Sequence, residues 1–436
     1  MSDEHALLAG LFRHEAGRLV AILTKRVGPS RLDLVEDAVQ DALVSAMRTW
    51  PLQGIPRNPS GWLHTAARNA LTDRFRRAKF EVPGDVDLEP STGADTAFSS
   101  EASLQDELLN LIAYCCHPAL TPSAQMALTL RLACGLSVPE IAGALLAKPD
   151  SIAQRIVRAK RELRELAVSF QLPAARELVE ERLPTILHAI YLLFDAGYLS
   201  LHHERWLRPA LCSDAVRISR LLALHPATEE PRAHALAALL HFSAARLPAR
   251  SDADGRPVPL AQQDRSKWDR SLIAAGFSHF DAAIGGDTIS RYHIEAAIAA
   301  VHARATAFAD TDWKEILGHY DALNELFPSP VVSLNRIIAM RYARGADAAL
   351  EEFNATDSLR DLQESLMYYA TLGELHSALG NDSHAVDAYQ RAAALAGNDA
   401  LQIIFRSRAS AMTRRDKSQE VHTESTECGA NKRSGG

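Results

Sequence analysis

The sequence predicts an all-α protein, and three observations support that prediction. Of its 436 residues, 47% are hydrophobic, with alanine and leucine dominant, and only 6% are aromatic. Long stretches lack the strict alternation of apolar and polar residues that is typical of strands. They also lack a regular series of glycine turns. Because alanine and leucine favour helices, we expect two or three helical domains in a chain of this length.

Residues 1–80 are expected to form the first domain. Apolar residues recur at helical spacing between Leu11 and Leu23, and Gly28-Pro29-Ser30 interrupts that pattern. A second helix is predicted from Leu32 to Trp50, followed by a proline-rich loop. Ser60 is suited to cap a third helix that runs to Lys79.

Charge is distributed unevenly along the chain. The net charge of −7 alone argues against nucleic acid as a partner, yet residues 1–80 hold 12 Lys/Arg against 8 Asp/Glu. Residues 81–100 hold five acids and no base. Together with their prolines and glycines, this composition predicts an acidic flexible linker over residues 81–102.

Opposite charges mark the second and third helices. Asp33, Glu36, Asp37 and Asp41 cluster within nine residues of the second helix. The third helix carries bases that could contact phosphate, namely Arg68, Arg74, Arg76, Arg77 and Lys79. Trp62 is interpreted as a core residue rather than a base-stacking one. An acidic helix face is usually only solvated, but this one is expected to lie beside a basic helix.

Residues 103–170 are predicted to hold four helices, the last two with helix-turn-helix spacing. A short helix is expected from Ser137 to Leu146, then a three-residue turn, then a helix from Asp150. We expect Ile152, Ile156, Val157 and Leu163 of that helix to serve the core. Residues 148–164 hold six bases against two acids, which suits a DNA major groove. The alternative is a solvated face on an ordinary bundle helix.

These segments together resemble the extracytoplasmic-function sigma factors of bacterial RNA polymerase. The resemblance is carried by DLVEDAVQDALVSAMRTW (33–50), GWLHTAARNALTDRFRR (61–77) and LSVPEIAGALLAKPDSIAQRIVRAKREL (136–163). It covers roughly the first 170 residues. It implies that residues 1–80 are sigma region two, which binds core polymerase and the downstream promoter element. Residues 103–170 would be region four, which reads the upstream element.

The resemblance also implies roles for individual residues. Core polymerase would be bound by Asp33, Glu36, Asp37, Gln40 and Asp41. The downstream element would be contacted by Arg68, Asn69, Arg74, Arg76 and Arg77. The upstream element would be read by Ser151, Gln154, Arg155 and Arg158. Pro149 and Asp150 depart from the expected pattern, because an acid at the start of the recognition helix can repel phosphate unless it acts as a helix cap.

The rest of the chain is expected to be a long helical extension. AIYLLFDAGY (189–198), ALLHFSAARLPAR (238–250) and QQDRSKWDRSLIAAG (262–276) resemble a sigma subgroup whose extension ends in tetratricopeptide-like repeats. We assign residues 171–288 to a helical extension and 289–412 to such repeats. Repeat positions are filled by Tyr369, Leu372, Gly373, Ala385, Tyr389 and Ala392. The alternative is an irregular helical bundle. Residues 413–436 are predicted to be a disordered tail.

The sequence contains no recognisable catalytic, cofactor or metal motif. Asp252, Asp254, Asp264 and Asp269 lie in a polar, loop-like stretch, but their spacing fits no calcium loop. We expect them to have structural roles. The five cysteines include no CxxC pair, which fits a reducing cytosol. No stretch of about 18 apolar residues occurs, so we expect neither export nor a membrane span. No enzyme activity and no cofactor are expected.

The leading interpretation is therefore a cytoplasmic sigma factor, with RNA polymerase core and promoter DNA as partners and an extension that regulates it. An alternative is a helix-turn-helix regulator with a helical ligand- or partner-sensing domain. The acidic helix from Asp33 and the basic helix from Ser60 favour the sigma factor, because a simple repressor needs neither. A third alternative is an enzyme housed in the extension with a DNA-binding module attached, but no recognisable catalytic constellation supports it.

Overall fold

The computed structural model describes residues 2–78, 101–200, 205–286 and 288–414, and in this part of the chain the regular elements are helices joined by loops, without β-strands. The predicted all-α class is confirmed. Ser251 and Pro257 form an isolated antiparallel bridge in a loop. The predicted linker from residue 81 to 100, Lys79, and the tail from residue 415 onward lie outside the described residues.

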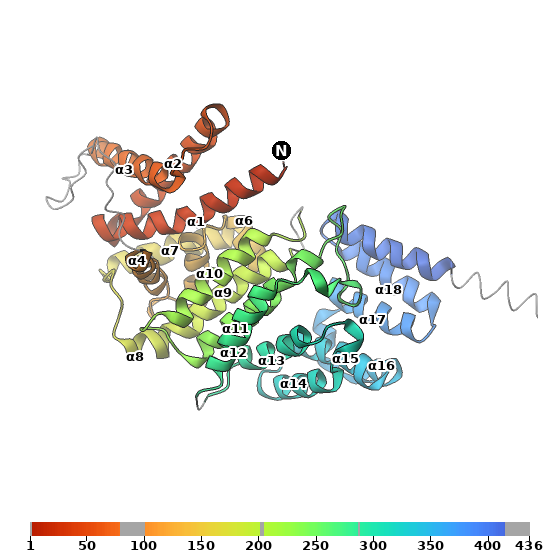
Figure 1. The fold of residues 1–436 in the computed structure, drawn as a ribbon. Coiled ribbons are helices and arrows are strands. Elements are labelled where there is room, and N and C mark those ends of the chain that lie inside the picture. The colour runs from red at the N-terminus through yellow and green to blue at the C-terminus, as the bar shows by residue number, and fades with distance from the viewer. Residues whose placement is uncertain (1, 79–100, 201–204, 287, 415–436) are drawn as a thin grey trace, which may run out of the picture. The chain divides into compact units, whose positions relative to one another are not determined.

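The first three helices form one group (Figure 1). They are α1 (Ser2–Val27), α2 (Leu32–Gln53) and α3 (Pro59–Ala78). The predicted break after α1 is present, with Gly28 at a φ of 85°. Helix α2 runs three residues beyond its predicted end because Pro51 is accommodated in its last turn, and Gly54 at a φ of 84° then terminates it.

The predicted cap of α3 is wrong. Ser60 lies inside the first turn, where its hydroxyl donates to Glu15 at 2.9 Å. The side-chain oxygen of Asn58 instead accepts from the Gly61 amide at 3.0 Å. Pro59 then occupies the first helical position, where its missing N–H costs nothing.

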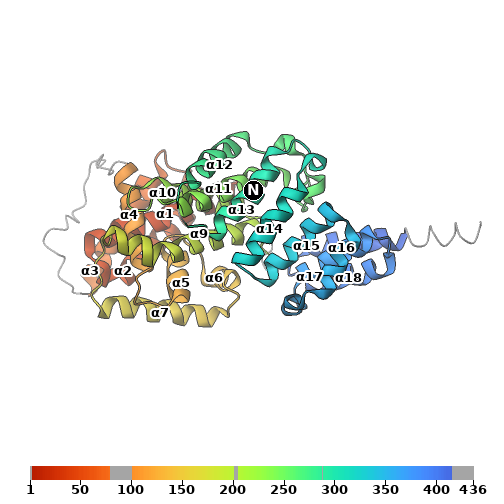
Figure 2. The same ribbon diagram turned by 90° about the horizontal axis from the view of Figure 1, so that it is seen from below.

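The next four helices follow the predicted breaks (Figure 2). They are α4 (Glu101–Cys115), α5 (Pro122–Leu132), α6 (Val138–Ala144) and α7 (Pro149–Glu165). Thr121 caps α5, and Ser137 with Glu140 forms a capping box at the start of α6. Helix α7 begins at Pro149, so Asp150 lies in the first turn and is not the cap residue.

Two compact units divide the chain, and the extension does not fall wholly into one of them. The first unit comprises Met1–Tyr198 and Arg208–Ala233, and the second comprises Leu199–Leu207 and His234–Gly436. The first unit therefore includes α8 (Ala175–Glu177), α9 (Leu183–Tyr198) and α10 (Pro209–Leu224). Helix α9 packs against α10, α5 and α6. Gly197 fits this packing, because a Cβ there would lie 2.7 Å from the Leu211 Cβ.

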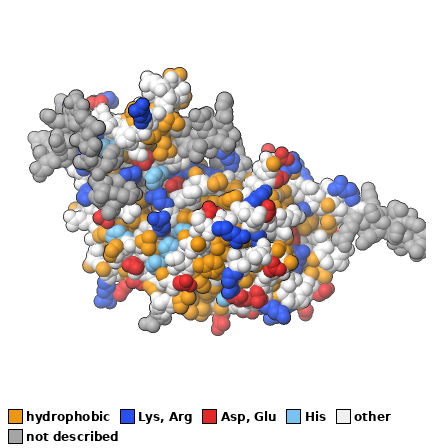
Figure 3. Space-filling model, in the orientation of Figure 1, with side chains coloured by type: hydrophobic (Ala, Val, Ile, Leu, Met, Phe, Trp, Pro, Cys, Tyr) orange, Lys and Arg blue, Asp and Glu red, His pale blue; other side chains and the backbone are white. Residues whose placement is uncertain are grey.

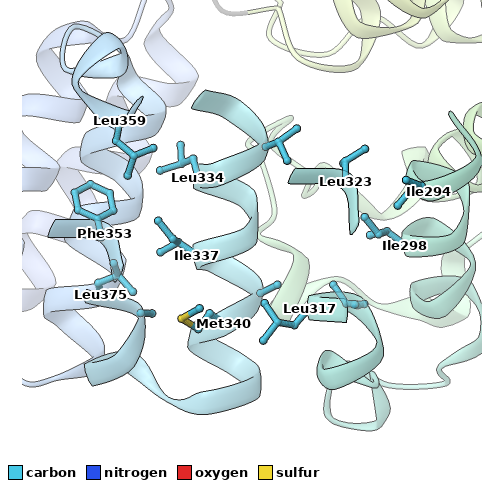
Figure 4. Packing of buried hydrophobic residues seen from close by; sticks show 14 of the residues in the cluster. Ile294, Ile298, Leu317, Leu323, Leu334, Ile337, Met340, Phe353, Leu359 and Leu375 are labelled. Carbon is cyan, nitrogen blue, oxygen red and sulfur yellow. The ribbon is translucent and has the colours of Figure 1, made fainter. Parts of the chain in front are cut away.

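The second unit is a succession of helices, and from α12 to α18 neighbours along the chain pack together. It contains most of α11 (Pro231–Ala245), then α12 (Arg270–Ala283), α13 (Arg291–Arg304), α14 (Trp313–Leu326), α15 (Pro330–Arg344), α16 (Ala346–Ala355), α17 (Leu366–Ala378), α18 (Asp382–Leu395) and helical residues 399–414. In Figure 4, Leu334 and Ile337 of α15 point toward Leu359 and Phe353. One apolar core thus links α13 through α17.

Candidate nucleic-acid and polymerase interface

The helix-turn-helix is built by α6, the turn after it and α7. The Ser137 amide donates to Glu140 at 2.7 Å, which satisfies a backbone group at the start of α6. Glu140 also pairs with Arg208, which immediately precedes α10. Burial raises the pKa of Glu140, but the hydrogen bonds from Ser137 and the Arg208 charge outweigh it, and the net shift is downward. The extension therefore contacts the helix-turn-helix within the first unit.

Helix α7 presents three different faces. Its buried face is formed by Ile152, Ile156, Ala159 and Leu163. Its exposed face carries Ser151, Gln154, Val157, Arg158 and Arg161. The prediction that Val157 serves the core is wrong, because this side chain is 66% exposed. A third face, with Lys160 and Arg164, points toward α2.

The predicted upstream-element residues therefore lie in two environments, one exposed and one half-buried. Ser151, Gln154 and Arg158 share the exposed face, where a major groove could approach them. Arg155 is half-buried, and its guanidinium donates to the Ser123 hydroxyl of α5. In this conformation Arg155 supports the packing of α7 on α5.

The predicted polymerase-binding residues of α2 also separate. Asp33, Asp37, Gln40 and Asp41 are exposed, whereas the Glu36 side chain is only 13% exposed. Asp37 and Asp41 lie one turn apart and both bind Arg74 of α3. The distances from the guanidinium are 3.1 Å to the Asp37 carboxylate and 2.7 Å to that of Asp41. The acidic helix thus lies beside the basic helix, as predicted.

The first two acids of α2 face the second domain instead. Glu36 accepts from Arg131 Nε of α5 at 2.7 Å and also pairs with Lys160 of α7. Asp33 lies 3.1 Å from Lys160 Nζ and also pairs with Arg164. No local sequence signal could have revealed these pairs, because their partners are 95 to 131 residues apart.

The predicted downstream-element residues of α3 occupy three environments. Asn69, Arg76 and Arg77 are exposed and available to a nucleic acid. Arg74 is held by the two acids of α2. Arg68 is buried at 6% exposure, so a DNA contact from it would require a rearrangement of this helix.

Trp62 of α3 packs as predicted. Its ring meets the buried Trp50 ring edge-on, with centroids 5.5 Å apart, and Trp50 in turn contacts Phe12 of α1 at 5.2 Å. These rings join the three helices of the group, which fixes the positions of the charged faces of α2 and α3.

Three of the four aspartates before α12 serve turns and helix ends, and the fourth, Asp254, pairs with Arg256 at 3.4 Å. Asp264 accepts from the Ser266 amide at 3.0 Å, and Asp269 caps α12 through Ser271 and Leu272. Asp252 accepts from the Arg256 amide. Arg265 binds the backbone carbonyls of His302 and Ala305 rather than a carboxylate, and its guanidinium lies over Trp268.

Two further kinds of site, a metal centre and a membrane span, are absent from the described residues. No group of three or more His, Cys, Asp or Glu side chains there is arranged to hold a metal ion. No described helix combines the length and apolar character needed to cross a membrane. On the face in Figure 3, basic and acidic side chains are interspersed with apolar ones.

Comparison with known families matches three parts of the chain. Residues 11–81 match Sigma-70 region 2, and residues 111–163 match Sigma-70, region 4. Residues 182–284 match a family of unknown function, DUF6596. The two sigma matches contain α2, α3 and the helix-turn-helix.

A curated relative is similar to this chain over most of its length. An uncharacterized protein of Rhizobium meliloti (strain 1021) is 39% identical over 376 residues, which cover 84% of this chain and 87% of the relative. No solved structure matches the chain.

Proposed function

The chain belongs to the sigma-70 family, as an extracytoplasmic-function-like sigma factor with a C-terminal extension, and we propose that it directs core polymerase to specific promoters under the control of that extension. Sigma-70 regions 2 and 4 support a role in promoter-directed transcription, and they imply interaction with core polymerase and promoter DNA. Sigma factor families are not enzymes. The observation that carries the proposal is one compact unit with an exposed basic recognition helix and an adjacent acidic and basic helix pair.

Roles follow from exposure and charge. Ser151, Gln154 and Arg158 are suited to reading base edges of an upstream element, because they share one solvent-facing side of α7. Asn69, Arg76 and Arg77 are suited to the downstream element. Asp37 and Asp41 offer the accessible carboxylates for core polymerase, with Asp33 and Glu36 beside them.

Control by the extension is supported by its first helices, which lie in the first unit. Helices α9 and α10 pack with the sigma domains, and Arg208 reaches Glu140 of the helix-turn-helix. A movement of α9 or α10 would therefore change the contacts that hold region 4 in place. We further propose that the later helices are tetratricopeptide-like and that the protein acts in the cytoplasm.

In vitro transcription tests the proposed function. Purified full-length protein and bacterial core polymerase would be incubated with a library of genomic promoter fragments. We expect the protein to form a holoenzyme and to start transcription at a defined set of promoters. A helix-turn-helix regulator would bind DNA alone and leave core polymerase unbound, and that result would contradict the proposal.

A further inference from the structure

We infer that region 4 covers part of the polymerase-binding surface of region 2, an inference that rests on the proposed function. Arg131, Lys160 and Arg164 bind Asp33 and Glu36, and we call these five residues the clasp. Core polymerase must displace the clasp before it can use the start of α2. The clasp is therefore an autoinhibitory contact within one chain.

Burial distinguishes the Glu36–Lys160 pair of the clasp from ordinary surface ion pairs, whereas Asp33 and Arg164 are about half exposed. The side chains of Glu36 and Lys160 are 13% and 12% exposed. Exposed ion pairs contribute little free energy to holding two domains together because water and salt screen them. Screening is much weaker for partly buried charges. Lys160 bridges Asp33 and Glu36, so each ion pair restricts the geometry of the next. The clasp is a connected network rather than a set of separate contacts.

The clasp also reverses the local charge of α2. Two carboxylates face three cations, so an approaching partner meets a net positive surface where the sequence has acids. Burial raises the pKa of Asp33, but the hydrogen bond and charge of Lys160 and the charge of Arg164 lower it by more. The net shift is downward, so the carboxylate stays ionised. A cationic partner surface is repelled there until the three bases move away.

Close backbone packing holds the two domains in this register. A Cβ on Gly17 of α1 would lie 2.2 Å from the Ala133 carbonyl oxygen at the end of α5. Region 4 can therefore reach this position only because residue 17 is glycine. Lys25 of α1 and the buried Glu107 of α4 form another ion pair between the domains. These contacts are independent of the clasp and place its bases over α2.

Asp37 and Asp41 remain exposed, so core polymerase can bind α2 before the clasp opens. A polymerase surface can first bind this free half of α2 and then compete for Asp33 and Glu36. The apparent affinity for core polymerase is reduced by the fraction of molecules whose clasp is closed. Weakening the clasp should therefore increase binding.

Two variants of the full-length protein test this inference. Lys160→Gln/Arg164→Gln removes two clasp bases and leaves Arg131, which also donates to the Leu136 carbonyl within region 4. Its control, Lys148→Gln/Arg161→Gln, makes the same charge change at exposed positions of α7 or its cap. Gly17→Ala disturbs the domain contact without any change in charge, and alanine favours the α1 helix. Its control is Gly10→Ala, where the added Cβ meets Ala210 at an ordinary 3.4 Å.

The measurement is equilibrium binding of each purified variant to core polymerase without DNA, so that contacts of α7 with a promoter do not contribute. We expect Lys160→Gln/Arg164→Gln and Gly17→Ala to bind about five- to tenfold more tightly than their controls. Hydrogen exchange of α2 and α7 checks that both variants fold. If Arg164→Gln alone is the only clasp variant that folds, it should bind about two- to threefold more tightly.

Three other outcomes overturn the inference. If wild type binds core polymerase while the clasp variants match their controls, the sigma factor role stands but the clasp does not inhibit. A gain with Gly17→Ala alone would assign inhibition to packing and remove the clasp from it. If neither wild type nor any variant binds core polymerase, the proposed function fails and the inference fails with it.

Discussion

Asp37 and Asp41 have two roles to reconcile, because they hold Arg74 and are also the accessible acids of α2. Reversing both charges with Asp37→Lys/Asp41→Lys should reduce binding to core polymerase by at least about tenfold, since a cationic partner would then be repelled. Both side chains are more than half exposed, so thermal unfolding should change little. Pull-down with core polymerase and a melting curve measure the two effects.

The control for that prediction is Arg74→Gln. It removes the contact of α3 with both acids but leaves their charges, so core binding should be retained. If charge reversal leaves holoenzyme formation unchanged, the polymerase-binding role of α2 is wrong. If Arg74→Gln alone abolishes binding, the acids act by positioning α3.

Arg158 and Arg155 should differ when DNA binding is measured. Arg158→Ala should weaken use of the upstream element by about 1–3 kcal/mol if this exposed side chain reads a base. Arg155→Ala should weaken it as well, together with a loss of stability, because Arg155 binds Ser123. Promoter titrations at several salt concentrations separate the cases, since a phosphate contact lowers affinity evenly across sequences and reduces the salt slope. Unchanged promoter binding by both variants would misplace the recognition helix.

The sequence predicted the helices better than the environment of single side chains. Helical spacing predicts a core position for Val157, which is exposed, and the family resemblance implies a DNA contact for Arg68, which is buried. Both lie next to residues of the opposite environment, and a helix turns by about 100° per residue. Which flank of a helix is covered depends on the neighbouring helix, and local spacing does not contain that information.

Helix α6 depends on Glu140 for its cap and for its contact with the extension. The folded-state pKa of Glu140 is lowered below its ordinary value of 4.5. Its stabilising effect is therefore present above that value and is lost as pH falls through the folded-state pKa. Glu140→Gln should destabilise α6 by about 1 kcal/mol at pH 7. The difference from wild type should shrink below pH 4.5.

Hydrogen exchange of residues 138–144, corrected for intrinsic rates at each pH, measures this effect. Glu165→Gln is the matched control, because Glu165 forms only an exposed pair with Arg161 in α7. A difference between wild type and Glu140→Gln that persists unchanged at low pH would rule out the ionised carboxylate as the cause.

The α17–α18 hairpin offers a test of the repeat assignment. A Cβ on Gly373 would lie 2.7 Å from the Tyr389 ring, and both residues occupy predicted repeat positions. Gly373→Ala should destabilise the second unit by about 1–3 kcal/mol through overpacking. Gly318→Ala in α14 meets nothing within 4 Å and should be neutral or stabilising. Denaturant unfolding compares them, and equal stability would contradict close packing at this crossing.

The extension joins the sigma domains in a way that composition does not predict. The predicted boundary lies after residue 170, whereas the compact units divide after Tyr198 and Ala233. Helix boundaries follow from local spacing and capping residues, which one sequence contains. The packing of α9 on α5 and α6 depends on matching two apolar surfaces far apart in the chain, which periodicity alone does not pair.

Shortening the chain should therefore have two distinct effects. Removing everything after Phe170 also removes α9, whose Ile186, Ile190 and Leu193 are fully buried in the first unit. Each such side chain contributes about 1.5–3 kcal/mol, so a chain of residues 1–170 should lose several kcal/mol and expose the apolar side of α5. A chain of residues 1–230 keeps α9 and α10 and should retain hydrogen-exchange protection in α5 and α6. Only the longer of these two chains allows a fair comparison with the full-length protein.

If the later helices regulate the sigma domains, transcription from one promoter by residues 1–230 should differ at least about threefold from that by the full chain. Equal transcription by the two, with α5 and α6 protected in both, would leave the second unit as a separate scaffold and confine any control to α9 and α10.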